Sequence, residues 1–237
     1  MAERAGIEKF GVDDFRELFP ASVSLCVGSH EMYGAPLFAE EERFVARATA
    51  QRRREFAAGR ACARLALRKL GVEAGPIAVG KRGAPVWPVG CVGSIAHTAN
   101  FCAAVAAKRQ DLAGIGFDAE DATPLGAAAS AVLTRREHDI CRAAPRRSDL
   151  DWPKLIFSAK EALYKCWFPL YQTPLDFPDV EVTLTSSVDA NRGSFQVRLV
   201  HTSPPPRLGL RCRWGVGGGT LFTAVTLLER AHGVPPS

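Results

Sequence analysis

Residues 114–121 constrain this chain more than any other segment. Their sequence, Gly-Ile-Gly-Phe-Asp-Ala-Glu-Asp, begins as a short apolar run and ends in acidic residues, which predicts a strand with an acidic end. If the strand continues through Glu120, its period of two places Asp118 and Glu120 on one face. Two carboxylates that point the same way repel each other unless a cation lies between them, and such oxygen ligands suit Mg²⁺. Taken alone, an Asp-x-Glu pair is more often a solvated strand end than a metal site.

A helix is predicted over residues 152–167. Pro153 suits its first turn, and no helix-breaking residue follows before Pro169. At about 100° per residue the apolar side chains share one wide face. The opposite stripe consists of polar residues, with Lys160 at its border: Lys154, Ser158, Glu161 and Lys165. Glu161 and Lys165 are therefore neighbours one turn apart, either as a surface salt bridge or as a third metal carboxylate with an ammonium beside it.

The conjunction of these two segments is much rarer than either part. Asp-x-Glu after a Gly-rich strand is followed, further along the chain, by Phe-Ser-x-Lys-Glu-Ala-x-x-Lys. This pair resembles the 4′-phosphopantetheinyl transferases of the surfactin/enterobactin-synthase (Sfp/EntD-like) type, over residues 52–227. The resemblance implies an α+β fold built as a pseudo-twofold pair of halves, each with an antiparallel sheet packed on helices. We expect the halves to span residues 1–113 and 114–237, with the active site in the cleft between them.

The same resemblance implies the reaction and its residues. Enzymes of this type transfer 4′-phosphopantetheine from coenzyme A to a serine of an apo acyl- or peptidyl-carrier protein and release 3′,5′-ADP. By analogy, Mg²⁺, with Mn²⁺ as a substitute, would be held by Asp118, Glu120 and Glu161. The catalytic residues would be Glu161, as the base for the carrier serine, with Asp118 and Lys165. Lys165 would also contact the coenzyme A phosphates, and Lys160 would be either a phosphate contact or half of a structural ion pair.

An arginine-rich helix is predicted from Gln51 to Leu70. Arg52, Arg53 and Arg60 lie on or beside its core-facing stripe, whereas its other arginines turn away: Arg54, Arg64 and Arg68. A guanidinium on a core-facing stripe needs an anion, which is either a protein carboxylate or a phosphate that arginine grips bidentately. In the resembling family basic residues near this helix hold the 3′-phosphate of coenzyme A, so Arg52 and Arg60 are the candidates.

Two further segments resemble coenzyme A contacts. The turn-rich stretch 81–88 offers Lys81 and Arg82, and the pattern alone does not choose between them. His97 resembles a family histidine that meets the coenzyme A phosphates. The hydroxyl residue that usually precedes it is replaced here by Ala96, so we expect Ser94, Thr98, a backbone N–H or water to supply the missing hydrogen bond.

Composition narrows the class of protein. The seven cysteines are odd in number and show no Cys-x-x-Cys spacing, which favours reduced core thiols in a cytoplasmic protein. No apolar run approaches membrane-spanning length, and the first residues are not typical of a signal peptide. The net charge of +5 favours an acidic partner, and a nucleic acid, an acidic protein or an anionic substrate would each suit it. We expect a monomer with neither nucleic acid nor membrane as a partner.

Two rival functions stay open at this stage. A Mg²⁺-dependent nuclease also uses carboxylates and a lysine, although such sites usually want Glu-x-Lys on a strand. A basic nucleic-acid-binding protein would use residues 51–70, but it needs those arginines to point outward. Mg²⁺-dependent binding of coenzyme A would separate both rivals from the transferase.

The remaining elements are predicted from period and turn signals. A short helix is expected over residues 12–18, and strands are expected over 23–27, 77–79, 101–107, 180–184, 194–199 and 220–227.

Overall fold

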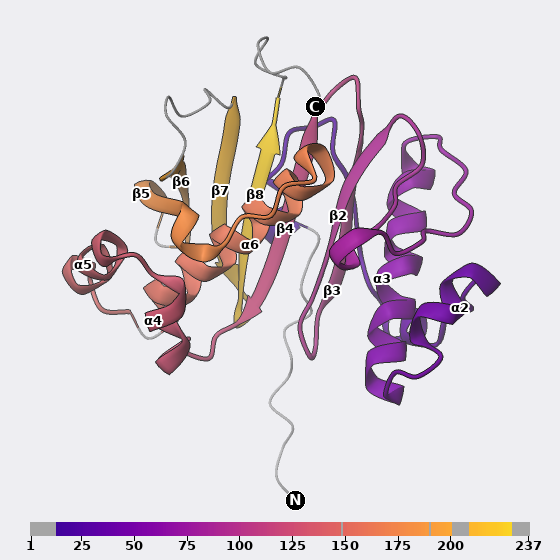
Figure 1. Ribbon diagram of the computed structural model, residues 1–237, viewed down its shortest axis with the longest axis horizontal. Helices are drawn as coiled ribbons and strands as arrows, with labels where there is room; N and C mark the ends of the chain where they lie inside the picture. Colours follow the sequence, from indigo (N-terminus) through magenta and orange to yellow (C-terminus); the bar gives the residue numbers. More distant parts are fainter. Residues whose placement is uncertain (1–12, 148, 190, 201–208, 229–237) are drawn as a thin grey trace, which may run out of the picture.

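The chain folds into two antiparallel sheets that lie side by side, each covered by one long helix (Figure 1). The computed structural model describes residues 13–147, 149–189, 191–200 and 209–228. Val12, the first residue of the expected N-terminal helix, lies outside them. None of the described helices is long and apolar enough to cross a membrane. The α+β class is confirmed.

The smaller sheet belongs to the first half of the chain. Its strand order is β1-β3-β2, with β1 at Ser24–Val27, β2 at Cys91–His97 and β3 at Cys102–Lys108. Helix α3 (Ala50–Lys69) packs on this sheet, and its N-terminus is capped by Thr49, whose side chain accepts a hydrogen bond from the Arg52 amide. The short helices α1 (Asp13–Arg16) and α2 (Ala39–Val45) and the 3₁₀ turns η1 (His30–Gly34) and η2 (Lys81–Gly83) complete this half.

The larger sheet belongs to the second half, in the order β4-β8-β7-β6-β5. Helix α6 (Trp152–Tyr171) packs on β4 and β8, and Asp151 caps it by accepting from the Lys154 amide. The bounds of the strands are β4 Gly114–Asp121, β5 Val180–Asp189, β6 Arg192–Leu199, β7 Leu210–Gly217 and β8 Thr220–Leu227. The remaining elements are η3 (Gly126–Ala128), α4 (Ala129–Val132), α5 (Arg135–Ala143) and η4 (Phe177–Asp179).

Both halves share one order of elements. Each begins with a strand, continues through a helix of 20 residues, and closes with antiparallel strands of which the last pairs with the first. In the first half β3 pairs with β1, and in the second half β8 pairs with β4. The halves differ in size because the second sheet has two additional strands, β5 and β6.

An aromatic cluster joins the two sheets. Phe15 from α1 stacks on Phe117 of β4 and Phe222 of β8, with ring centroids 5.5 and 5.2 Å apart, and Phe101 meets Phe222 edge-on at 5.1 Å. These phenylalanines are 0–4% exposed. Burying each one contributes about 1.5–3 kcal/mol, so the cluster fixes the two halves relative to each other.

Helix α6 lies directly on the backbone of β4. A Cβ atom built on Gly116 would stand 1.8 Å from the carbonyl oxygen of Ala162, and one on Gly114 would stand 2.7 Å from Leu170. Only glycine permits so close an approach of strand and helix. The Gly-Ile-Gly pattern therefore sets the distance between the acidic end of β4 and the polar stripe of α6.

Four expected features differ from the structure. Residues 77–79 form no strand and contribute only an isolated bridge between Val79 and Pro85. Strand β2 was not predicted, because glycine, serine and alanine give it little strand propensity. Strand β7 was also missed, although its arginines alternate with the buried Cys212 and Trp214. Helix α6 continues through Pro169, since a proline in the last turn removes few helical hydrogen bonds.

The contact at Gly116 predicts a large stability effect. Replacing Gly116 with alanine should lower the free energy of unfolding by about 3 kcal/mol or more, because helix and strand must separate. Gly34→Ala is the matched control: a Cβ there meets nothing within 4 Å, and the change should stay within about 1 kcal/mol. Urea unfolding of both variants measures the difference. Equal stabilities would show that α6 is not held against β4 in this way.

Candidate active site

The centre of the site is Asp118, which lies on β4 and is 5% exposed. Its Oδ1 accepts a hydrogen bond from the Lys165 ammonium at 2.7 Å, and its Oδ2 accepts one from the Ser158 hydroxyl at 2.8 Å. Both donors come from α6. A buried carboxylate is costly unless it is paired and hydrogen-bonded, and Asp118 is both.

The polar stripe of α6 faces β4 rather than open solvent. Lys154 and Ser158 are buried, and the stripe continues through Glu161 to Lys165. Thr223 of β8 anchors its middle by donating a hydrogen bond to the Ser158 carbonyl at 2.8 Å. The residues that the sequence placed opposite the apolar face therefore line up along the acidic strand.

Glu120 lies one pleat beyond Asp118 and pairs with Lys154. The Lys154 ammonium is 3.3 Å from a Glu120 oxygen and 3.4 Å from Asp121. Burial raises the pKa of Glu120 above its ordinary value, and the neighbouring Asp118 charge raises it further, while Lys154 acts in the opposite direction.

Glu161 faces the same carboxylate from the helix. Burial is the larger cause that raises the pKa of Glu161, and repulsion from Asp118 is the second. Lys165 lowers this pKa, but by less than the two effects that raise it. Burial and the charge of Asp118 thus both oppose the ionisation of Glu120 and Glu161.

The opposite wall of the site is basic and comes from the first half. Arg52 on α3 lies 2.8 Å from Nε2 of His97 at the end of β2, and Glu55 is 3.9 Å from the other ring nitrogen. Burial lowers the pKa of His97, and the Arg52 charge lowers it further. The imidazole is thus neutral near pH 7, with Arg52 as its donor.

Arg60 lies deeper on the same helix, about two turns beyond Arg52. It is 5% exposed, its Nε donates to the Ile77 carbonyl at 2.7 Å, and its guanidinium lies 4.1 Å from the Phe56 ring centroid. Burial lowers the pKa of Arg60 to about 10. Across the described part of the chain, no carboxylate lies within ion-pair distance of it. The anion that this guanidinium needs is therefore not supplied by a described carboxylate.

The two walls enclose a cleft of about 360 Å³. Its lining includes predicted site residues from both halves of the chain: Arg52, Arg60, Arg82 and His97 from the first, and Glu161 and Lys165 from the second. A smaller hollow of about 220 Å³ adjoins it and shares Arg82, Glu161 and Tyr164. Cations of the first half thus face Glu161 and Lys165 of α6 across a space of small-ligand size.

The predicted metal ligands can be examined for whether their side chains suit a divalent cation. Within the described ranges, no three His, Cys, Asp or Glu side chains form a metal-binding group. Lys165 and Lys154 engage Asp118 and Glu120 instead. The chemistry of the group still fits a hard cation, since the donors are carboxylate oxygens and the two glutamates carry raised pKa values.

Two predicted contacts are occupied by the protein itself. The Ser94 hydroxyl accepts from the Phe117 amide at 3.0 Å and donates to its carbonyl at 3.2 Å, so it joins β2 to β4 and is not free for a phosphate. Of the two roles open to Lys160, the structure shows the ion pair. Its buried ammonium bonds Glu137 at 2.7 Å and the carbonyls of Val132 and Phe177, which uses all three of its protons.

The structure also gives the locations and partners of the basic residues of α3 and η2. Arg82 lines the cleft, whereas Lys81 lines a separate pocket. Arg53, expected beside the core, is exposed and pairs with Glu42 at 2.5 Å. Arg64, expected to turn away, reaches the fully buried Glu41 at 2.7 Å. A helical wheel does not show the neighbouring α2, whose carboxylates attract both side chains.

Sequence reasoning missed the roles of two residues. Ser158 and Lys154 were placed on the polar stripe but not in the site, although they hold Asp118 and Glu120. Their spacing from Glu161 and Lys165, three or four residues at each step, was the available signal.

Comparisons with known proteins agree with this geometry. Residues 40–107 match the family described as 4′-phosphopantetheinyl transferase N-terminal domain, and residues 114–203 match the 4′-phosphopantetheinyl transferase superfamily. The chain is 41% identical to 4′-phosphopantetheinyl transferase Svp of Streptomyces mobaraensis, over 88% of each chain. It is 38% identical to 4′-phosphopantetheinyl transferase PptT of Mycobacterium tuberculosis, over 89% of this chain and 96% of the relative. It is 30% identical to enterobactin synthase component D of Salmonella typhi, over 76% of this chain and 74% of the relative.

The raised pKa values of Glu120 and Glu161 predict a pH dependence. A carboxyl group whose pKa is raised by folding stabilises the fold fully below its unfolded pKa, and this contribution is lost as pH rises through the folded pKa. Asp118→Asn removes the charge that both glutamates face, so its free energy of unfolding should fall less steeply above about pH 4.5. Urea unfolding in EDTA across this pH range gives the slopes. Identical slopes in both proteins would contradict the coupling.

Proposed function

The chain belongs to the 4′-phosphopantetheinyl transferase superfamily, and we propose that the cleft between its sheets is where the phosphopantetheine group is transferred. The protein transfers 4′-phosphopantetheine from coenzyme A to a serine of an apo carrier protein and releases 3′,5′-ADP. The acceptors we propose are acyl- and peptidyl-carrier proteins.

One observation carries the assignment of the site. Arg52, Arg60 and His97 of the first half line one cleft with Glu161 and Lys165 of α6. Lys165 in turn bonds Asp118 of β4 at 2.7 Å. Coenzyme A carries a pyrophosphate and a 3′-phosphate, so it needs several cations at fixed separations. Buried Arg60 is suited to the 3′-phosphate because it lacks a protein carboxylate, and Arg82 stands at the same cleft.

The acidic wall would hold the divalent cation. Asp118, Glu120 and Glu161 are the proposed ligands of Mg²⁺, which when bound supplies charge neutralisation at the pyrophosphate. Lys165 and Lys154 balance Asp118 and Glu120 in the ligand-free protein. These ammonium groups hold the two carboxylates in place.

The chain's own residues account for the proton and the leaving group. The carrier serine Oγ forms a new bond to the phosphorus that bears pantetheine, and the bond from that phosphorus to the bridging oxygen of 3′,5′-ADP breaks. Glu161 accepts the serine proton, and its raised pKa brings it closer to the operating pH than an ordinary glutamate. Lys165 neutralises the charge that develops on the departing 3′,5′-ADP.

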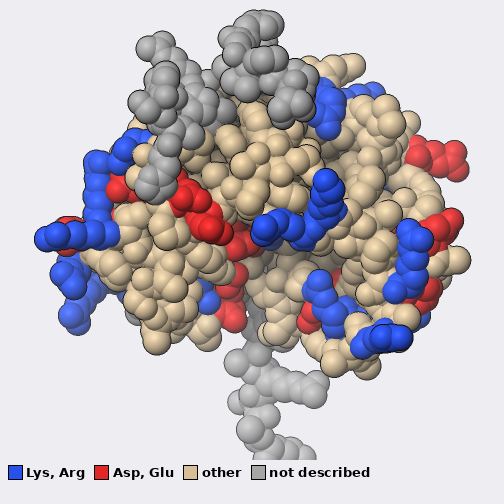
Figure 2. Space-filling model, in the orientation of Figure 1, with Lys and Arg blue, Asp and Glu red and all other residues tan. Residues whose placement is uncertain are grey.

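A positive surface is available for an acidic carrier. Basic side chains gather over α5 on the face shown in Figure 2, where Arg135, Arg136 and Arg142 are exposed. Arg136 lies 3.7 Å from Glu181, and Arg142 lies 4.0 Å from Asp139. Arg147, which follows α5, is bound to Asp149 and Asn191.

The carboxylate roles predict a loss of activity without a loss of fold. Asp118→Ala and Glu161→Ala should each lower kcat by about a hundredfold or more, because each removes charge or base from the reacting centre. Glu73→Ala, which removes an exposed carboxylate outside the cleft, is the matched control. The measurement is the mass gain of an apo-carrier protein incubated with coenzyme A and Mg²⁺. Turnover within a few-fold of wild type in both variants would show that the catalytic centre lies elsewhere.

The position of Arg60 predicts a ligand-specific loss. Arg60→Ala should weaken coenzyme A by about ten- to a hundredfold and leave 3′-dephospho-coenzyme A nearly unaffected, since one charge-assisted phosphate contact is lost. Arg68→Ala, an exposed arginine of the same helix, should change neither affinity. Calorimetric titration compares the two ligands. Equal losses for both would mean that Arg60 does not hold the 3′-phosphate.

A further inference from the structure

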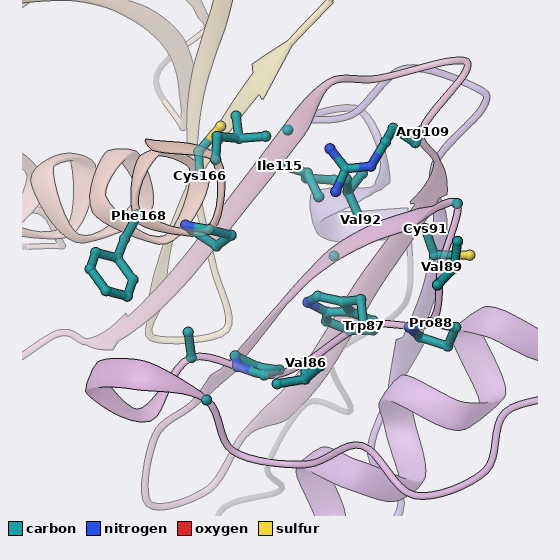
Figure 3. Close-up of a pocket in the computed structure, with 18 of the residues that line it drawn as sticks. Val86, Trp87, Pro88, Val89, Cys91, Val92, Arg109, Ile115, Cys166 and Phe168 are labelled. Carbon is teal, nitrogen blue, oxygen red and sulfur yellow. The ribbon is translucent and has the colours of Figure 1, made fainter. Parts of the chain in front are cut away.

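A second, larger pocket of about 560 Å³ lies beside the active-site cleft (Figure 3). It forms where the loop between η2 and β2 meets the first residues of β4 and the last turn of α6. Val86, Trp87, Val92, Ile115 and Phe168 supply much of its wall. Its volume is in the range of small-ligand sites, which are mostly apolar with a few polar groups.

The rim of this pocket is unusually apolar. Val86 is 51% exposed and Val89 is 104% exposed, and both belong to the pocket lining. They are two of the few large hydrophobic side chains that the described part of the chain leaves in water. Clustered exposed apolar side chains beside a hollow indicate a surface that a ligand covers.

The charged groups of the pocket have one sign. Arg109 and Lys81 line it, and no aspartate or glutamate does. Figure 3 shows Arg109 extending its guanidinium toward the pocket. No ion pair or side-chain hydrogen bond is recorded for this guanidinium among the described residues. A cation without a carboxylate at the edge of an apolar hollow favours an anion there.

Trp87 adds a polar group without a partner. Its indole Nε1 is buried, and no acceptor among the described residues lies within hydrogen-bond distance. Trp87 also packs so tightly on Gly93 that a Cβ there would stand 2.6 Å from the ring. The Trp87 ring therefore forms a closely packed, apolar part of the pocket wall.

We propose that this pocket binds a small organic anion with a linear apolar tail, of the medium-chain carboxylate class. The tail lies among the apolar wall residues, and the carboxylate lies toward Arg109. The site is distinct from the cleft: the two share only Ala84, Pro85, Gly93, Phe168 and Pro169, and neither Arg52 nor His97 lines the pocket. The proposal therefore does not rest on the transferase reaction.

Decanoate, kept below its micelle concentration, is the probe. Calorimetry should give saturable one-to-one binding, with butyrate much weaker and decyltrimethylammonium absent. Arg109→Gln should weaken decanoate by about tenfold, the loss of one charge-assisted contact. Lys108→Gln, the exposed neighbouring cation outside the lining, should change affinity by less than about twofold and serves as the matched control.

A second pair of variants covers the event that Arg109→Gln unfolds. Val86→Glu places a negative charge at the exposed rim and should weaken decanoate, whereas Val86→Lys should not. Saturating coenzyme A should leave decanoate affinity unchanged. The proposal is overturned if decanoate does not saturate, if Arg109→Gln and Lys108→Gln lose affinity equally, or if Arg52→Gln or coenzyme A abolishes binding, which would place decanoate in the cleft.

Discussion

The contact between α6 and β4 is the constraint on which the rest of the site depends. Gly116 lets the helix backbone approach the strand so closely that no side chain fits between them. Asp118, two residues later, therefore meets Ser158 and Lys165 at hydrogen-bond distance. The same closeness keeps water from the buried Asp118 carboxylate, which strengthens the charge interactions around it. Moving the strand and the helix apart would break the hydrogen bonds of Asp118 to Ser158 and Lys165.

The electrostatics of the site follow from that burial. Asp118 is paired with Lys165, whereas the pKa values of Glu120 and Glu161 are raised, mainly by burial and further by the Asp118 charge. A divalent cation would relieve this repulsion, and an anionic ligand would satisfy the buried Arg60 on the opposite wall. Binding of coenzyme A with a metal thus answers both imbalances at once. The aromatic cluster packs the two sheets together without either of these charge imbalances.

The sequence was sufficient for the centre of the site and insufficient for its edges. The Gly-rich strand and the polar stripe of α6 were predictable because each has a period that maps directly onto one face. Lys160 and Arg64 were not, because their partners Glu137 and Glu41 come from other elements and only tertiary packing brings them near. Ser94 could not be assigned either, since its partner lies across the boundary between the two halves. The role of a polar residue beside the apolar face of an element can be assigned only when its partners from other elements are known.

The most direct test of the account is the affinity of the wild-type protein for coenzyme A, measured by calorimetry in Mg²⁺ and again in EDTA. Because the proposed Mg²⁺ ligands would face the pyrophosphate of coenzyme A, Mg²⁺ should tighten binding by about tenfold or more. Neither a nuclease nor a nucleic-acid-binding protein requires such a dependence. Equal affinity with and without the metal would contradict the proposal that Asp118, Glu120 and Glu161 hold a cation against coenzyme A.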